Sequence, residues 1–386
     1  MNTSEYKKFL RSCSKNIDNS DFELFNVDKI VHSVFDDVEK LRVEAHRIRK
    51  KFLDNIVDNL LLFEKNLISN KATIDWCLSY EDFTERLSNL LTKKKIKAVN
   101  AFSSNFTEQL DLKNILKNEA IAAFSKENLC TIHEPYLGIV DSGSLFSVFE
   151  SSFEMELFLD SKTKIFVVPI NKFICNISDI DVFTHIFSIY KNNNSFPYLS
   201  NIFTPNQSEN NEQIHVFIVD NGRSNLLSLK EQRKALFCID CGACSRVCPV
   251  YQTIKDKPYN NKLTGPIANV TLPFLENFDN HKHLTYNCLL CGNCSKVCPV
   301  NLSIPDLIIE NRKYFYENKI LDYDDNFLFL SLRKFFLRDK NMNLKAWFKR
   351  YLLRRIMPKT TRKQLQIPQF ATRTFNQIQQ EKNKKQ

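Results

Sequence analysis

The sequence predicts an α/β domain with a largely parallel sheet, preceded by long helices and followed by an α-helical, cysteine-rich domain. Apolar residues recur at steps of three and four near the N-terminus, which favours helices. Short apolar runs then alternate with amphipathic segments, and eight of the twelve cysteines fall in two later blocks. We expect a helical region at 1–73, the α/β domain at 74–226, the cysteine-rich domain at 227–320 and a basic helical tail at 321–386 that is disordered at its end.

The leading region has the pattern of one or two long helices. Apolar side chains recur through 27–69 with charged residues between them, and this stretch contains neither proline nor glycine. We interpret the apolar stripe as a packing face.

The middle of the chain has the pattern of a parallel sheet with crossover helices. Apolar runs at 96–102, 120–124, 165–170 and 215–220 read as strands, and the segments 105–117 and 179–190 read as helices. Two Asx-Gly turns, at 141–144 and 220–223, are most simply structural turns.

A cysteine run that occurs twice is the most specific pattern in the chain. The first copy is Cys238-x2-Cys241-x2-Cys244-x3-Cys248-Pro249, and the second is Cys288-x2-Cys291-x2-Cys294-x3-Cys298-Pro299. In proteins with two 4Fe-4S clusters, the fourth cysteine of each such run binds the other cluster. The runs therefore predict two 4Fe-4S clusters, one held by Cys238, Cys241, Cys244 and Cys298 and the other by Cys288, Cys291, Cys294 and Cys248.

Structural zinc and disulfides are the alternatives to this prediction. Zinc sites usually combine two separated cysteine pairs, whereas these ligands come in blocks of four that end in Cys-Pro. Disulfides are disfavoured because the N-terminus carries no apolar signal core, so we expect a reducing, cytoplasmic setting. The remaining cysteines match no ligand spacing and are expected to be small buried hydrophobes: Cys13, Cys77, Cys130 and Cys175.

Composition excludes several classes of function. No run reaches the roughly 18 apolar residues of a membrane span. Glycine occurs only six times, and neither G-x-G-x-x-G nor G-x4-G-K-[ST] is present, so binding of NAD or ATP in those ways is not expected.

Positive charge is concentrated at the end of the chain. Residues 331–386 hold 16 Lys/Arg and 2 Asp/Glu, a local charge of +14 within a net charge of +10. The segment 327–357 mixes aromatic and basic residues and has three interpretations: a basic helix that packs on the body or on a partner, a helix at the inner membrane surface, or, least favoured, a nucleic-acid contact.

Several segments resemble the lactate utilization protein B family. The resemblance is carried by HVFIVDNGRSNLL, by both cysteine runs with TGPI between them, and by LGIVDSGSLFSVF and KIFVVPINKFI upstream, and it covers roughly residues 40–320. It implies an iron–sulfur subunit of a bacterial complex that oxidises L-lactate to pyruvate. It also implies an α/β domain of the sugar-isomerase/CoA-transferase kind, a helical dicluster ferredoxin domain, and two companion subunits: a protein with CCG repeats and a lone α/β-domain protein.

This chain departs from the family pattern in its α/β half. Asp141-Ser142-Gly143 stands where the family tends to have Glu-Thr-Gly, and Ala268 stands where it has glycine. The segment 96–110 lacks the lysine- and serine-rich strand end of the family. Because of these departures, we do not infer from the family a small-molecule site in the α/β domain of this chain.

The function predicted from the sequence is therefore electron transfer in a lactate-oxidising complex. No histidine lies in a recognisable catalytic arrangement, and His281 and His283, near the second run, are expected to be exposed loop residues. We expect a non-catalytic subunit, with electron transfer to another dehydrogenase, of glycolate or disulfide type, as the alternative. A nucleic-acid-binding iron–sulfur protein is a less favoured third hypothesis.

Overall fold

The computed structural model describes residues 38–102, 104–118, 130–190, 199–205, 213–259 and 263–320, together with the single residues 351 and 384. Met1–Tyr314 and Phe315–Gln386 form two compact units, each treated by itself. Residues 1–37, the run 120–124 and nearly all of the basic segment 327–357 lie outside the described residues.

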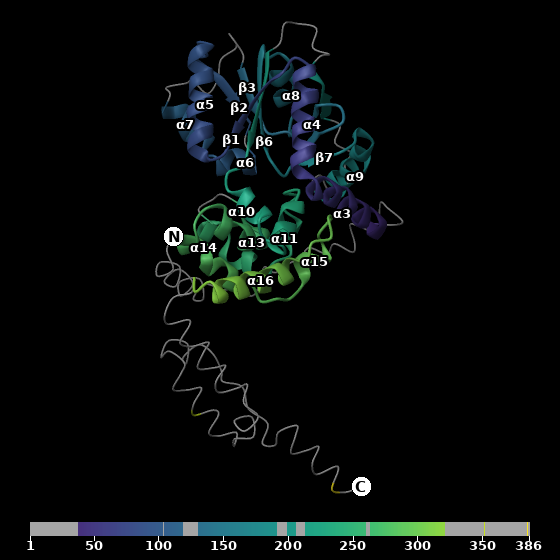
Figure 1. The fold of residues 1–386 in the computed structure, drawn as a ribbon, viewed down its shortest axis with the longest axis vertical. Coiled ribbons are helices and arrows are strands. Elements are labelled where there is room, and N and C mark those ends of the chain that lie inside the picture. The colour runs from purple at the N-terminus through teal and green to yellow at the C-terminus, as the bar shows by residue number, and fades with distance from the viewer. Residues whose placement is uncertain are drawn as a thin grey trace. The chain divides into compact units, whose positions relative to one another are not determined.

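A five-stranded parallel sheet forms the centre of the α/β domain (Figure 1). Its strand order is β1-β9-β6-β3-β2, and every neighbouring pair is parallel. The strands are β1 (Thr73–Cys77), β2 (Val99–Ala101), β3 (Cys130–His133), β6 (Thr163–Pro169) and β9 (Gln213–Val219). The predicted largely parallel sheet is confirmed, because the two apolar runs at its centre are fully buried on both faces, as a covered parallel sheet requires.

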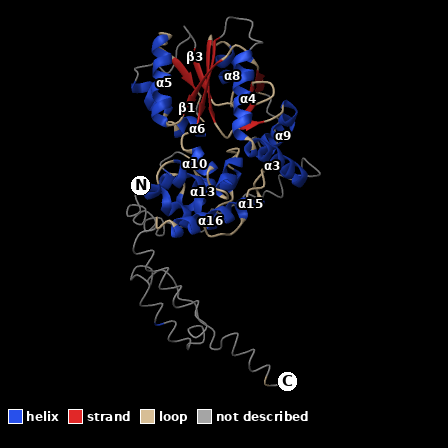
Figure 2. Ribbon diagram, in the orientation of Figure 1, coloured by secondary structure: helices blue, strands red, loops and turns tan. Residues whose placement is uncertain are grey.

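Helices cover both faces of this sheet (Figure 2). On one face lie α5 (Tyr80–Lys93), α6 (Asn105–Gln109) and α7 (Leu112–Asn118), and on the other lie α4 (Ile56–Ser69) and α8 (Ser152–Leu159). The α5 side chains Phe83, Leu87 and Leu91, at steps of four, are buried against the strands. The remaining helices of this domain are α3 (Val38–Asp54), which continues the predicted N-terminal stripe, and α9 (Ile180–Tyr190).

A second, four-stranded sheet stands beside the first and was not anticipated from the sequence. Its order is β7-β4-β5-β8, and its pairings are antiparallel except for β4 with β7. The strands are β4 (Leu137–Ile139), β5 (Ser144–Val148), β7 (Phe173–Ile174) and β8 (Ser200–Phe203). The turn at 141–143 joins β4 to β5, with Gly143 at φ +58°, and Asn66 of α4 donates to the carbonyls of Val140 and Asp141. This Asx-Gly turn is thus tied into the fold.

Residues 223–320 are built from short helices and 3-10 turns, and the described part of this range contains no strand. The elements are α10 (Arg223–Leu227), η3 (Gln232–Phe237), α11 (Ala243–Arg246), α12 (Pro249–Ile254), η4 (Lys257–Tyr259), α13 (Gly265–Leu275), α14 (Phe278–His281), η5 (Lys282–Asn287), α15 (Asn293–Lys296) and α16 (Ile304–Glu317). The predicted helical character of the cysteine-rich region is confirmed.

The turn at 220–223 links the sheet to this helical region. The Asp220 carboxylate accepts hydrogen bonds from the backbone N–H and the hydroxyl of Ser224, both at 2.7 Å, and so caps α10. Asn225 in α10 donates to the carbonyl of Phe274 in α13 at 3.0 Å. The second Asx-Gly turn therefore also has a structural role.

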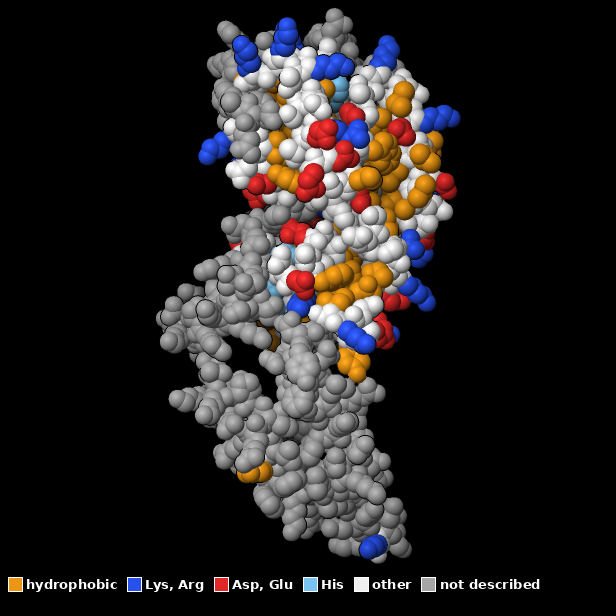
Figure 3. Space-filling view, turned by 60° about the vertical axis from the view of Figure 1, so that its left-hand side comes forward, with side chains coloured by type: hydrophobic (Ala, Val, Ile, Leu, Met, Phe, Trp, Pro, Cys, Tyr) orange, Lys and Arg blue, Asp and Glu red, His pale blue; other side chains and the backbone are white. Residues whose placement is uncertain are grey.

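On the face that Figure 3 displays, hydrophobic side chains gather in patches, and charged side chains are scattered around and between these patches. In the described part of the chain, the exposed apolar residues include a row along α4, formed by Val57, Leu61 and Ile68. No described helix is long and apolar enough to cross a membrane.

Candidate metal centre

Four cysteines line the first of two cavities in the helical region. They are Cys238, Cys241 and Cys244 of the first run and Cys298 of the second. The cavity has a volume of ≈ 60 Å³, several times the roughly 10–15 Å³ that one water molecule needs. Its other walls are largely apolar and include Ile267 and Val300.

The other four cysteines line the second cavity. Cys288, Cys291 and Cys294 come from the second run and Cys248 from the first, around a volume of ≈ 20 Å³. At this site, Cys291 is exposed and the neighbouring Leu289 is 71% exposed. Each cavity thus combines three cysteines of one run with the last cysteine of the other.

The two runs repeat one local backbone structure. A 3-10 turn, η3 or η5, ends just before the first cysteine, and Gly242 or Gly292 then takes φ +72° or +79° at the start of the next short helix. The second residue after each first cysteine donates its N–H to that sulfur: Asp240 to Cys238 at 3.4 Å and Leu290 to Cys288 at 3.3 Å. Left-handed backbone at the glycines and N–H donation to sulfur are what a loop around a sulfur-rich group needs.

The last cysteine of the first run has a second structural role. Cys248 caps α12, where its sulfur accepts from the backbone N–H of Tyr251 at 3.4 Å, and Pro249 occupies the first turn. The chain therefore leaves the loop as a helix immediately after this cysteine.

Three features test whether a 4Fe-4S cluster suits these cavities. A Cβ placed on Gly242 or Gly292 would meet no described atom within 4 Å, so space is open beside both glycines. The Tyr136 hydroxyl is buried without a hydrogen-bond partner in the described structure, and burial together with the nearby Cys241 thiol raises its pKa. Burial raises the pKa of Cys241 and Cys294 to about 12, so thiolates here need a bound cation to form. All three features fit the cluster.

The spacing of the thiols also bears on the zinc alternative. In the described residues, no three or more His, Cys, Asp or Glu side chains approach closely enough to hold a single metal ion. Four sulfurs at about 2.3 Å from one zinc would lie close together, whereas the thiolates of a cubane each bind a different iron. The first cavity, at ≈ 60 Å³, has room for a larger group than one ion.

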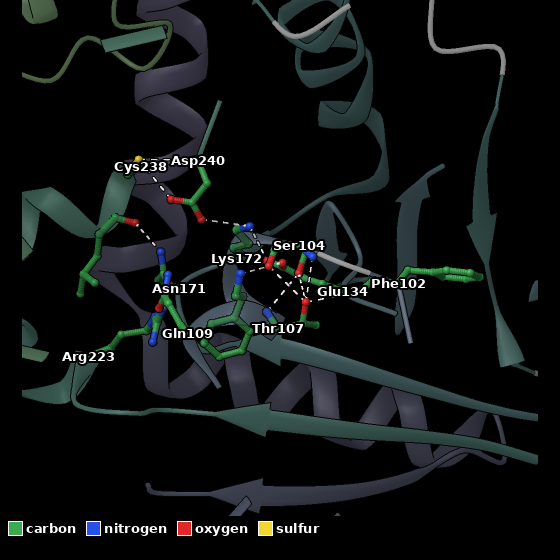
Figure 4. A network of polar contacts seen from close by, with 12 residues as sticks. Phe102, Ser104, Thr107, Gln109, Glu134, Asn171, Lys172, Arg223, Cys238 and Asp240 are labelled. Carbon is green, nitrogen blue, oxygen red and sulfur yellow. Dashed lines mark hydrogen bonds and ion pairs between the residues drawn. The ribbon is translucent and has the colours of Figure 1, made fainter. Parts of the chain in front are cut away.

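A buried polar network lies beside the first cavity, at the carboxyl ends of the parallel strands (Figure 4). Lys172, just after β6, is 2.5 Å from the Glu134 carboxylate and 3.0 Å from that of Asp240. Glu134 follows β3, and Asp240 lies between two cysteines of the first run. Burial alone would raise the pKa of Asp240, but Lys172 and Arg223 outweigh it and hold that pKa below its usual value.

The same network extends to the 220–223 turn. Arg223 donates to the Asn171 side chain at 3.0 Å and to that of Gln109 at 3.2 Å, and its guanidinium lies over the Phe106 ring. Ligands of open α/β sheets usually bind at this edge. Here the described side chains of the chain itself occupy it.

The prediction that His281 and His283 are exposed loop residues is wrong. They are 2% and 7% exposed, because α14 and η5 pack against α13 and bury the residues that flank Leu284. Neither lines a cysteine cavity. The predicted burial of Cys77, Cys130 and Cys175 is confirmed, and Cys13 lies outside the described residues.

Comparison with known proteins supplies a family for the cysteine-rich region. Residues 234–302 match the 4Fe-4S dicluster domain. One solved structure, a DUF162 family protein from Deinococcus radiodurans, is similar with a TM-score of 0.32 and 10% identity, over 43% of this chain and 98% of that one.

Curated relatives carry the name lactate utilization protein B. The protein from Shouchella clausii is 38% identical over 28% of this chain and 22% of its own length, and that from Bacillus thuringiensis is 30% identical over 41% and 34%. Lactate utilization protein B 1 from Bacillus mycoides is 25% identical over 73% of this chain and 72% of its own length. Two of these three matches thus span less than two thirds of the relative. The chain is therefore a sequence relative of lactate utilization protein B, as the sequence patterns predicted, and carries a 4Fe-4S dicluster domain.

Proposed function

We propose that this chain is the electron-transfer subunit of a complex that oxidises L-lactate to pyruvate, and that it holds two 4Fe-4S clusters. One cluster is assigned to Cys238, Cys241, Cys244 and Cys298, and the other to Cys288, Cys291, Cys294 and Cys248. The observation that carries the proposal is the pair of cavities, each lined by one of these sets. The dicluster match and the names of the relatives support it.

When bound, the clusters accept and release single electrons. The chain supplies eight thiols, backbone N–H donors to the sulfurs, and largely apolar walls around the first cavity. Cys291 is the exposed cysteine of the two sets, and we assign exchange of electrons with a partner to its side of the molecule.

Oxidation of lactate itself is assigned to a companion subunit. Among the described residues, no histidine or lysine that could take a proton from a substrate hydroxyl lines either cysteine cavity. The companions that the family resemblance implies, a CCG-repeat protein and a lone α/β-domain protein, are the proposed partners.

A genetic test separates the cluster thiols from the other cysteines. A strain without this gene is complemented with the wild-type gene, with Cys241→Ser, with Cys294→Ser or with Cys175→Ser, and growth on L-lactate is compared with growth on glycolate. Cys175 is a matched control, since it is buried but lines neither cavity. We expect growth on lactate with the wild type and Cys175→Ser only. Normal growth on lactate of the deletion strain contradicts the proposal, and a defect confined to glycolate assigns the subunit to another dehydrogenase.

A further inference from the structure

Arg49 of α3 is a fully buried cation that has no acidic partner among the described residues. Its side chain is 0% exposed, and its guanidinium donates only to backbone carbonyls. Two of these, Leu236 at 2.8 Å and Phe237 at 3.2 Å, belong to the turn that ends at Cys238. Two more, Phe173 at 2.6 Å and Asn171, belong to the segment after β6.

The nearby carboxylates are already engaged. Glu134 and Asp240 both pair with Lys172, and Arg223 bonds to amide side chains and a backbone carbonyl. Three buried cations, Arg49, Lys172 and Arg223, thus face one buried carboxylate, Glu134, and one that is 18% exposed, Asp240, in the described structure. A buried charge without a counter-charge is costly, so a missing anion is expected close to Arg49.

The position of Arg49 identifies that anion. Its guanidinium holds the two carbonyls directly before Cys238, the first thiol of the first cavity. Burial lowers the pKa of Arg49 to about 10, and the Cys238 thiolate is the strongest of the charges that oppose this. A cubane with four thiolate ligands carries net negative charge, which increases when it takes up an electron.

We propose that Arg49 is the buried counter-cation of the cluster assigned to Cys238, Cys241, Cys244 and Cys298, and that it raises the reduction potential of that cluster. This inference rests on the cluster assignment of the proposed function, but not on lactate as the substrate. A fixed positive charge stabilises the reduced form more than the oxidised form, because the reduced form carries one more negative charge.

The second cavity has a different electrostatic setting. In the described structure, two guanidiniums contact the second run. Arg42 donates to the carbonyls of Ser295 and Cys298, both at 2.9 Å, but its charge is already paired with Glu39. Arg312 is only partly buried and donates to the carbonyls of Cys288 at 3.0 Å and Thr285 at 3.1 Å. Solvent weakens the effect of such a charge. The influence of Arg49 should therefore be confined to one of the two clusters.

The test is a potentiometric titration of the purified, iron-loaded protein, followed by EPR spectroscopy. Arg49→Met removes the charge and Arg49→Lys keeps it with fewer hydrogen bonds. Arg47→Met is the matched control, since Arg47 lies on the same helix but is exposed and paired with Glu44. Cys291→Ser, measured alongside, identifies the reduction step of the second cluster.

We expect Arg49→Met to lower the midpoint potential of one cluster by about 59 mV or more. For a one-electron couple, 59 mV corresponds to a tenfold change in the equilibrium constant of reduction. That midpoint should be the one unaffected by Cys291→Ser, while Arg49→Lys and Arg47→Met stay near the wild type. Three results would overturn the proposal and leave Arg49 with a purely structural role. They are unchanged midpoint potentials in Arg49→Met, a shift in Arg49→Lys equal to that in Arg49→Met, and loss of iron from both variants. Absence of iron from the wild type would instead refute the cluster assignment itself.

Discussion

Replacing Lys172 by methionine should strongly destabilise the α/β domain. The Lys172 amino group pairs with Glu134 at 2.5 Å and with Asp240 at 3.0 Å, and the exposed fractions of these side chains are 7%, 4% and 18%. Without Lys172, two largely buried carboxylates lose their partner. Breaking a buried pair in this way costs about 3–5 kcal/mol.

The chain offers a control, a second ion pair with the same distance between its charged atoms but with much more exposed side chains. Lys234 pairs with Glu231 also at 2.5 Å, but these side chains are 53% and 36% exposed. A pair exposed to this extent contributes about 0–1 kcal/mol. The two substitutions, Lys172→Met and Lys234→Met, therefore separate the effect of burial from the effect of distance.

Urea denaturation of the iron-loaded protein under anaerobic conditions, followed by circular dichroism, measures both costs. The midpoint of Lys172→Met should fall well below that of Lys234→Met at an unchanged denaturant slope. A double variant, Lys172→Met with Glu134→Gln, should recover part of the loss because one unpaired carboxylate is gone. Equal stabilities of the two single variants would refute the reasoning.

Two other substitutions test separate parts of the structure. Burial lowers the pKa of His133 from 6.5 to about 3; since only the unfolded chain binds that proton between these values, stability should fall by about 1.4 kcal/mol per pH unit below pH 6.5. In His133→Phe, the free energy of unfolding should fall less steeply with pH, by the contribution of one proton. Urea denaturation between pH 7.5 and 5 measures this slope, and the same slope in wild type and variant would contradict the lowered pKa of His133. A Cβ on Gly265 would lie 1.9 Å from the Ser245 hydroxyl, whereas one on Gly292 meets nothing. In the iron-free protein, Gly265→Ala should therefore lower the thermal midpoint far more than Gly292→Ala, for which only the positive φ costs about 1–2 kcal/mol; equal losses would contradict the clash.

Regular patterns in the sequence predict the parts of the fold that depend on local structure. The apolar runs that become β6 and β9 are buried on both faces, and such runs are typical of central parallel strands. The ligand pattern predicts two sets of four thiols, and the two cavities are lined by the same two sets. That each set binds a cluster stays a prediction.

The polar network could not be predicted in the same way. Glu134, Lys172 and Asp240 are far apart in sequence and meet only through the order of the strands. A partial signal was available, since Glu134 and Lys172 follow β3 and β6, and the carboxyl ends of parallel strands meet at one edge of a sheet. Asp240, between two cysteines, gave no indication that it faces the sheet.

Arg49 and the second sheet were missed for related reasons. Arg49 lies among the buried residues of α3, next to Ile48 and close to Phe52, but a long basic side chain in a helix is usually solvated. The second sheet uses strands of two to five residues, and β7 has only Phe173 and Ile174. Such short runs carry too little periodicity to be recognised.

The metal content of the purified protein tests the central claim most directly. Protein prepared or reconstituted without oxygen should contain about eight iron and eight sulfide per chain, four for each cluster, with little zinc. Reduction with dithionite should then give an EPR signal from two neighbouring 4Fe-4S clusters. One or two tightly bound zinc ions per chain, with iron far below eight, would contradict the account.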